Sequence, residues 1–360
     1  MILMETALCV RENNTQWIAA ASSKFGRFRP ETEEKIREHQ ARPSPVLEDM
    51  KKAWAACEEI DHNNYDMSIS RMLIAKNPRF SAKDIEVFSI ALAGFQDEEH
   101  FPYKAGLFLS ALINRSEDSE FVIHTSHLSK PVNTLGYRNT KNIAVDGDVG
   151  HGVGSRMKDG SITIDGNADN KVGQRMGGGI IAVAGKAGDS IGHEMTGGII
   201  TVGGDAGESV GGWMQNGAIT VRGYVGPGAG KYMRAGTIRI GGDAGDSVGT
   251  AMSGGTIIVE GGAGDWAGSD MVNGTIIVGK GTGSYVGYSM KGGAITVNGN
   301  ACVVGWLMNS GTITIEGNAG EKVGYCMSSG EIYLAGGSFA LSDDIRGGKI
   351  FHNGELVFPK

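Results

Sequence analysis

Two histidines, His124 and His127, have the residue type and spacing of a metal-binding motif. Histidines three or four residues apart on a helix can offer their ring nitrogens to one zinc ion. Here, however, they follow the apolar run 121–123, Phe-Val-Ile, which is typical of a β-strand. Residues i and i+3 of a strand point to opposite faces, and no Cys or carboxylate lies beside them at a recognised ligand spacing. We keep both as candidate metal ligands, and we expect no metal, no other cofactor and no catalytic residue.

The composition argues against several classes of function. Lys and Arg number 33 against 40 Asp and Glu, a net charge of −7, whereas a nucleic-acid-binding domain carries a basic face. No apolar run reaches the roughly 18 residues of a membrane span. The four cysteines, Cys9, Cys57, Cys302 and Cys326, form no Cys-x-x-Cys pair and are typical of reduced thiols. We therefore expect a cytoplasmic protein that binds neither nucleic acid nor membranes.

Glycine divides the chain into two parts, because all but four of the 59 glycines lie after residue 140. The glycine-poor part is patterned as helices. Pro45 suits a first helical turn, Ser81 and Asp84 have capping-box spacing before an apolar run, and a third apolar stretch spans 103–113. We expect residues 1–120 to form a mainly helical domain.

Methionine marks a repeat in the glycine-rich part, where ten of the fifteen methionines fall at one phase. They are Met157, Met176, Met195, Met214, Met233, Met252, Met271, Met290, Met308 and Met327, spaced by 19 residues with one spacing of 18. Glycine stands three residues before and three residues after each of them, and isoleucine stands five residues after. Such agreement of phase indicates a repeat architecture.

Each repeat predicts one coil of a β-solenoid. The alternation of Ile, an intervening residue that is often Thr, and Val or Ile makes a short strand with one buried face, and the flanking glycines allow the chain to turn. Nineteen residues suit three short strands and three corners. Coils stacked about 4.8 Å apart set Ile on Ile and Met on Met. We therefore interpret the methionines as core filler rather than as a stripe that binds soft metals or hydrophobic ligands.

These patterns predict an α+β protein of two domains. A helical domain over residues 1–120 precedes a right-handed single-stranded β-helix of about ten coils over 146–336. Residues 121–145 form a junction and capping strand segment. Residues 337–360, where the period is lost, form a C-terminal cap. A cap over each end would prevent the coils from stacking into fibres.

An aromatic residue stands two positions before Met in each of the last three coils. These residues are Tyr288, Trp306 and Tyr325. Exposed aromatic rows are typical of protein interfaces, and stacked aromatic rings also stabilise the coils that carry them. We take the three residues as candidates for an interaction surface and leave the stacking alternative open.

A partly acidic row stands six positions before Met. It consists of Asp189, Glu208, Asp246, Asp265 and Glu321. Stacked carboxylates can bind cations or a basic partner, but such a row is more often a solvated face that discourages aggregation. We favour the solvated face.

The repeat resembles the GXGXG family of right-handed β-helices. A good copy spans 197–211, Gly-Gly-Ile-Ile-Thr-Val-Gly-Gly-Asp-Ala-Gly-Glu-Ser-Val-Gly, and the resemblance covers about residues 140–336. The family includes the C-terminal domain of the glutamate synthase large subunit and the β-helical subunit of formylmethanofuran dehydrogenase. In these relatives the β-helix is implied to be a structural and assembly element, with the chemistry in other domains or subunits. This chain has Ile2 where the synthase would have a nucleophilic cysteine, and it has no iron–sulfur cysteine spacing. The resemblance thus supports the presence of a β-helical module and does not support a glutamate synthase activity.

Two functions of different classes follow. The first is a non-catalytic assembly subunit or module of a cytoplasmic multi-subunit enzyme of oxidoreductase or amidotransferase type. It would bind protein partner subunits, form a homo-oligomer, or do both. The alternative is a stand-alone enzyme, or a protein that binds a small molecule or metal, with its site between the helical domain and the first coils. That groove would contain His124, His127, His151 and Arg156.

Overall fold

The computed structural model describes residues 45–57 and 80–359 of a chain that falls into two compact units, Met1–Ala56 and Cys57–Lys360. In the first unit, helix α3 (Pro45–Ala55) begins at Pro45 as predicted, because a proline in the first turn removes no helical hydrogen bond. Met50, Ala53 and Trp54 are its buried residues. The rest of the predicted helical domain before residue 80 lies outside the described residues.

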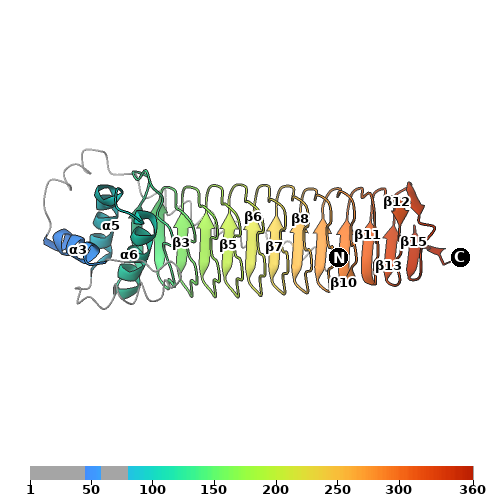
Figure 1. Ribbon diagram of the computed structural model, residues 1–360, viewed down its shortest axis with the longest axis horizontal. Coiled ribbons are helices and arrows are strands. Elements are labelled where there is room, and N and C mark those ends of the chain that lie inside the picture. Colours follow the sequence, from blue (N-terminus) through green and yellow to red (C-terminus); the bar gives the residue numbers. More distant parts are fainter. Residues whose placement is uncertain (1–44, 58–79, 360) are drawn as a thin grey trace. The chain divides into compact units, whose positions relative to one another are not determined.

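From residue 80 on, the described part of the second unit contains α5 (Ala82–Ala91), the 3-10 helix η1 (Leu92–Phe95) and α6 (Phe101–Arg115). The predicted capping box of α5 is confirmed. The Ser81 hydroxyl accepts a hydrogen bond from the Asp84 N–H, and the Asp84 carboxylate accepts one from the Ser81 N–H. Phe88 of α5 packs on Phe108 of α6, with 5.3 Å between ring centroids. Figure 1 shows these two helices at the N-terminal end of the sheet.

Helix α6 is seated on the segment that leads into the sheet. Its backbone comes so close to Asn133 that a Cβ atom on Gly106 would lie 1.7 Å from the Asn133 carbonyl oxygen. The Asn133 N–H donates to the Pro102 carbonyl oxygen at 2.8 Å, and the Gly136 N–H donates to the Ser110 hydroxyl at 2.9 Å. Helix α6 therefore contacts the first turn of the solenoid directly.

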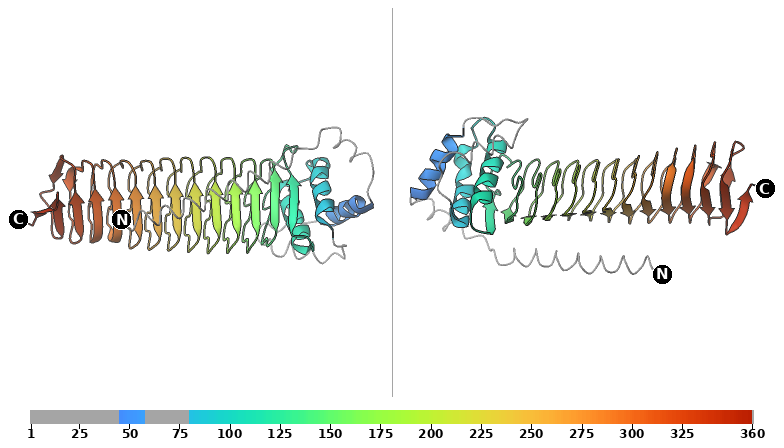
Figure 2. Two further views of the ribbon diagram at one scale, coloured as in Figure 1. Left: turned by 180° about the vertical axis from the view of Figure 1, so that it is seen from behind. Right: turned by 90° about the horizontal axis from the view of Figure 1, so that it is seen from below.

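The sheet has fourteen strands in the order β1-β2-β3-β4-β5-β6-β7-β8-β9-β10-β11-β13-β15-β16, and every pairing except that of β15 with β16 is parallel. The strands are β1 (Glu120–His124), β2 (Asn142–Asp146), β3 (Ser161–Ile164), β4 (Ile180–Val183), β5 (Ile199–Val202), β6 (Ala218–Val221), β7 (Thr237–Ile240), β8 (Thr256–Val259), β9 (Thr275–Val278), β10 (Lys291–Val297), β11 (Ser310–Ile315), β12 (Gly320–Val323), β13 (Glu331–Leu334), β14 (Phe339–Leu341), β15 (Lys349–His352) and β16 (Glu355–Phe358). Isoleucine pairs with isoleucine in register, as Ile162 does with Ile181. The predicted β-solenoid is confirmed, with about 12 coils (Figures 1 and 2).

A typical coil contains one regular strand, where the sequence predicted three. A second side is reduced to isolated parallel bridges, such as the one between Ala187 and Ala206. The third side is a turn segment that leads up to the methionine. There the residue directly before each of the ten methionines has a left-handed φ of 54–60°, and the glycine three residues before Met is also left-handed. These angles are incompatible with a regular strand.

The core is made of the repeated residues. All ten methionines are fully buried, and the isoleucines five residues after them are buried to the same degree. The interpretation of the methionines as core filler is confirmed. Gly211 shows why the glycine before Met recurs, since a Cβ atom there would lie 2.3 Å from Cδ1 of Ile238 in the next coil.

The sheet extends past both predicted limits of the solenoid. Strands β1 and β2 fall largely in the predicted junction, and β15 falls in the predicted C-terminal cap. The junction also contains a turn segment of the repeat type. The residues five, three and one positions before Asn139 are left-handed, as they are before most of the methionines: Thr134, Gly136 and Arg138. The fully buried Asn139 takes the place of the methionine. The methionine spacing does not mark this turn because the methionine is absent.

Candidate functional site

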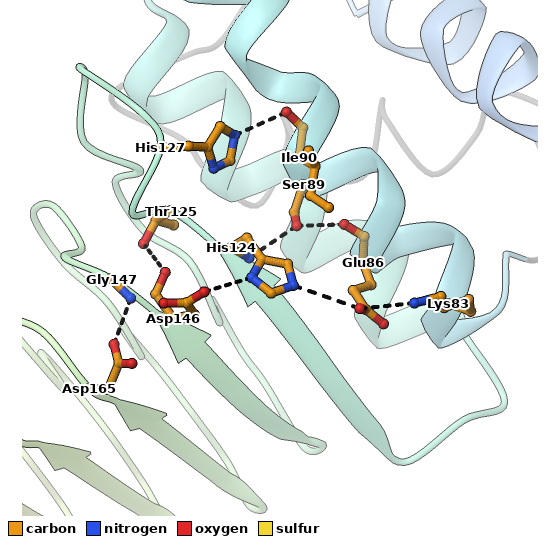
Figure 3. Close-up of polar contacts among 10 residues, drawn as sticks. All are labelled: Lys83, Glu86, Ser89, Ile90, His124, Thr125, His127, Asp146, Gly147 and Asp165. Atoms are coloured by element: carbon orange, nitrogen blue, oxygen red, sulfur yellow. Dashed lines mark hydrogen bonds and ion pairs between the residues drawn. The ribbon is translucent and has the colours of Figure 1, made fainter. Parts of the chain in front are cut away.

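His124 joins helix α5 to the sheet (Figure 3). It ends β1, and its Nδ1–H donates to the Asp146 carboxylate of β2 at 2.8 Å. Its Nε2 lies 3.7 Å from the Glu86 carboxylate of α5. These carboxylates, Glu86 above all, raise the pKa of the half-buried imidazole, and the same contact lowers the pKa of Glu86. The arrangement is a charged bridge between α5 and β2.

The backbone at His124 is tied to the same helix. The His124 N–H donates to the hydroxyl of the buried Ser89 at 3.0 Å, and that hydroxyl donates to the Glu86 carbonyl oxygen at 2.6 Å. The Ser89 hydroxyl is therefore engaged with backbone atoms at both of these contacts (Figure 3). Its geometry is that of a packing contact, not of a serine activated by a histidine ring.

His127 has a different environment from His124. Its Nε2 lies 3.0 Å from the Ile90 carbonyl oxygen of α5, so this nitrogen carries a proton and donates. Burial lowers the pKa of His127 and favours its neutral form. Over residues 45–57 and 80–359, no three His, Cys, Asp or Glu side chains come together in a way that could hold a metal ion.

His151 and Arg156, the other two residues of the predicted groove, lie in the first repeat. The His151 ring packs edge-on against Tyr103 of α6 at 6.5 Å, and burial lowers its pKa. Arg156 is the left-handed residue before Met157, and its N–H donates to the Gln174 carbonyl oxygen of the next coil at 2.8 Å. The predicted residues are thus divided, with His124 and His127 against α5 and His151 against α6.

Aromatic rings gather on the turn segments of the solenoid. We call the positions five, two and one residues before each Met the turn face. Its C-terminal group contains the three predicted residues and two more: Trp266, Tyr285, Tyr288, Trp306 and Tyr325. Trp266 stacks on Tyr285 with 4.3 Å between centroids, and Trp306 packs on Tyr325 at 4.2 Å. Tyr285 joins the two pairs through Trp306 at 5.8 Å.

A second aromatic group lies nearer the N-terminus of the same face. Trp213 and Tyr232, directly before consecutive methionines, stack at 4.3 Å and are 43% and 36% exposed. The Lys231 ammonium lies 5.4 Å from the Tyr232 centroid, within reach of a cation–π contact. The sequence prediction missed this pair, although its 19-residue spacing is a signal of stacking. Because stacked rings cover one another's faces, such pairs turn their edges toward solvent.

The acidic row six residues before Met has a structural role that its charge did not indicate. The Asp246 carboxylate accepts the Asp265 N–H of the next coil at 2.9 Å, and Asp265 in turn accepts the Ser284 N–H at 2.6 Å. Asn170 makes the same contact to the Asp189 N–H at 2.7 Å. These side chains therefore satisfy backbone donors between coils.

Replacing Asp246 by Ala should lower the free energy of unfolding by about 1 kcal/mol, because the Asp265 N–H loses its acceptor. For a solenoid of this size the melting temperature should fall by about 2–4 °C. Asp246→Asn is the matched control, since Asn170 shows that an amide oxygen serves equally well. Thermal unfolding followed by circular dichroism makes the comparison. Equal losses in both variants would show that charge, and not the hydrogen bond, matters.

Neither Cys302 nor Cys326 gives a sign of an activated thiol. Both are free, and Cys9 lies outside the described residues. The Cys326 thiol donates to the Asp344 carboxylate at 3.0 Å, and this contact raises the pKa of the thiol. A raised pKa lowers the fraction of reactive thiolate.

Comparison of the chain with protein-family models, with curated proteins and with solved structures finds no match. Within residues 45–57 and 80–359, no helix has the length and apolar character needed to cross a bilayer. The likeness to the GXGXG β-helices therefore rests on the repeat residues. The structure establishes a parallel β-solenoid with a repeat of about 19 residues.

Proposed function

We propose that the chain is a non-catalytic assembly module of a cytoplasmic multi-subunit enzyme of oxidoreductase or amidotransferase type, and that its turn face is the docking surface. The observation that carries the proposal is the set of seven aromatic side chains on this face, between Trp213 and Tyr325. Tyrosine and tryptophan are enriched in interfaces, where they act as anchors.

The rigidity of the solenoid supports this use of the rings. Each ring of the two stacked pairs is held by a ring on the neighbouring coil, so little side-chain freedom remains to be lost on binding. Repeat proteins commonly bind partners along an extended face of this kind. The resemblance of the repeat to the β-helices of glutamate synthase and formylmethanofuran dehydrogenase supports the class of parent enzyme.

The test is capture of the tagged full chain from cells that express it naturally. Wild type should retain subunits of oxidoreductase or amidotransferase type in fixed stoichiometry, and the double variant Trp306→Ser/Tyr325→Ser should lose them. Tyr333→Ser is the matched control, because Tyr333 also stacks on a neighbouring ring, that of Phe351 at 4.8 Å, but belongs to strand β13. Circular dichroism verifies that the variants are folded.

The alternative function has its own readout. The purified chain would bind a metal ion or a metabolite with a stoichiometric heat of binding, and His124→Ala/His127→Ala would abolish that heat. Zn²⁺ titrated by calorimetry is the first probe. Such a result, without retained subunits in the capture, would contradict the assembly proposal.

A further inference from the structure

The outward side of the sheet is almost free of charge over the ten consecutive strands β2 to β11, which lie side by side in one row (Figure 1). On each strand two outward side chains alternate with two buried ones, which gives twenty outward positions. They hold nine threonines, four isoleucines, four alanines and one residue each of Asn, Ser and Arg. Since 20% of the chain is charged, four charges would be expected where there is one. We call these twenty positions the outer sheet face.

The single charge on the outer sheet face, that of Arg239 in β7, is directed to its edge. The guanidinium donates to the carboxylate of Glu260, which directly follows β8. Other charged residues also lie along this edge, each directly after a strand: Asp165, Arg222 and Glu316. An uncharged centre with a polar rim is the anatomy of a protein interface.

The repeat of the outer sheet face restricts which partner can fit it. Its side chains recur once per coil, about 4.8 Å apart, over a length of about 48 Å. A helix laid along the solenoid has one turn per 5.4 Å, so its side chains would fall out of step by about one full repeat over ten strands. A second solenoid with the same repeat stays in step along the whole length, and a second copy of this chain has that repeat.

We infer that the outer sheet face docks on the same face of a second copy of this chain about a twofold axis. The two sheets would lie about 10 Å apart, as in other face-to-face packings. Strands of four residues make the face about 13 Å wide, so the two copies together bury about 1,200 Å², the size at which stable specific interfaces begin. The threonine hydroxyls would keep hydrogen bonds through interfacial water, of which there are about ten molecules per 1,000 Å².

Large side chains meet small ones in this arrangement. A twofold axis along the solenoid sets the first outward position of each strand against the second outward position of the same strand in the other copy. Ile180 then meets Ala182 of the second copy, and Ile277 meets Thr275. Arg239 meets a threonine, and no isoleucine meets another. An axis along the strands, between β6 and β7, gives the same matches of large with small residues, so the face is complementary to itself.

The test places a charge at the centre of the face in the purified full chain, with masses measured by sedimentation and by light scattering after gel filtration. Wild type at about 10 μM should have twice the 37.7 kDa mass of one chain. Thr220→Lys should weaken dimerisation by about tenfold or more, because each dimer would have to take two ammonium groups out of water. Ser253→Lys, at an exposed turn position beside Met252, is the matched control and should stay dimeric.

Arg239→Thr should have the opposite effect. It removes the one charge of the outer sheet face, so the dissociation constant of the dimer should fall below that of wild type. Misfolding of the variant would not produce tighter dimers, so this result separates an interface from a loss of stability.

Four results would each overturn the inference: a monomeric wild type, a Thr220→Lys variant as dimeric as wild type, equal weakening by Ser253→Lys, or a weaker dimer in Arg239→Thr. Melting temperatures show whether each variant is folded. The docking of enzyme subunits is judged separately, because the outer sheet face and the turn face share no residue. A monomeric chain that retains enzyme subunits would contradict only the second-copy docking, and a dimer that retains none would contradict only the parent enzyme.

Discussion

Replacing Gly211 by alanine should destabilise the solenoid by about 3 kcal/mol. The left-handed φ of 67° at Gly211 costs a residue with a Cβ atom about 1–2 kcal/mol. The new methyl group would also lie 2.3 Å from Cδ1 of Ile238, and forcing it into the packed core costs about 1–3 kcal/mol more. Chemical denaturation followed by circular dichroism measures the loss.

Two variants separate the two costs of Gly211→Ala. Gly228 is left-handed as well, with a φ of 80°, and a Cβ atom there would come no closer than 3.4 Å to a neighbouring side chain, so Gly228→Ala has the conformational cost without the clash and should cost about 1–2 kcal/mol. Ile238→Val removes Cδ1, the atom that the new methyl group would meet. Alone it should cost about 1 kcal/mol, but combined with Gly211→Ala it should cost less than the sum. Strict additivity would show that packing against Ile238 is not the cause.

The anchorage of α5 should weaken as the pH rises, because folding favours the charged form of His124. The contacts with Glu86 and Asp146 raise the pKa of His124 above its ordinary 6.5. A raised pKa contributes stability that is fully present below pH 6.5 and is lost as the pH rises through the folded value. The lowered pKa of Glu86 gives the opposite dependence on the acid side. The bridge is therefore strongest in the weakly acidic range between the two.

Hydrogen exchange of the α5 amides measures this anchorage. Protection factors in wild type should fall between pH 6 and pH 8.5. His124→Gln should lower protection at pH 6 about tenfold, since a hydrogen bond to a charged group contributes about 1.5 kcal/mol. His127→Gln is the control. The lowered pKa of His127 makes its contribution disappear on acidification instead. Protection that is equal at both pH values in wild type would rule out the charged bridge.

The repeat allowed the strands, their register and the core to be predicted from the sequence. Each position of the coil occurs about ten times in the sequence. The burial of Met252 or Ile257 is therefore predicted by the repeat and needs no evidence from its own neighbours in the sequence. The turn at Asn139 escaped the same reasoning because a buried asparagine replaces the methionine there. The repeat thus identified the core residues but did not identify the coil whose sequence departs from the repeat.

Other features have no local sequence signal. The residue before Met is Arg175 in one coil and Trp213 in another, and neither type indicates a left-handed conformation. Hydrogen bonds to the next coil hold it, as when the Arg175 N–H donates to the His193 carbonyl oxygen at 2.9 Å. The contact of Glu86 with His124 likewise depends on the packing of α5 on the sheet, which no periodic pattern encodes. The sequence therefore identified residues of the candidate site but not the groups that they contact.

The in-register pairing of isoleucine with isoleucine restricts how such a rod can change in length. Removing the 19 residues 234–252 would join equivalent points of two coils and shorten the rod by about 4.8 Å, with every remaining pair intact. Removing one residue from a strand would shift its side chains to the opposite face and expose the core. Tandem duplication of whole coils is thus the natural route by which a gene for this protein grows or shrinks. The distance between the ends of the solenoid changes in steps of one coil.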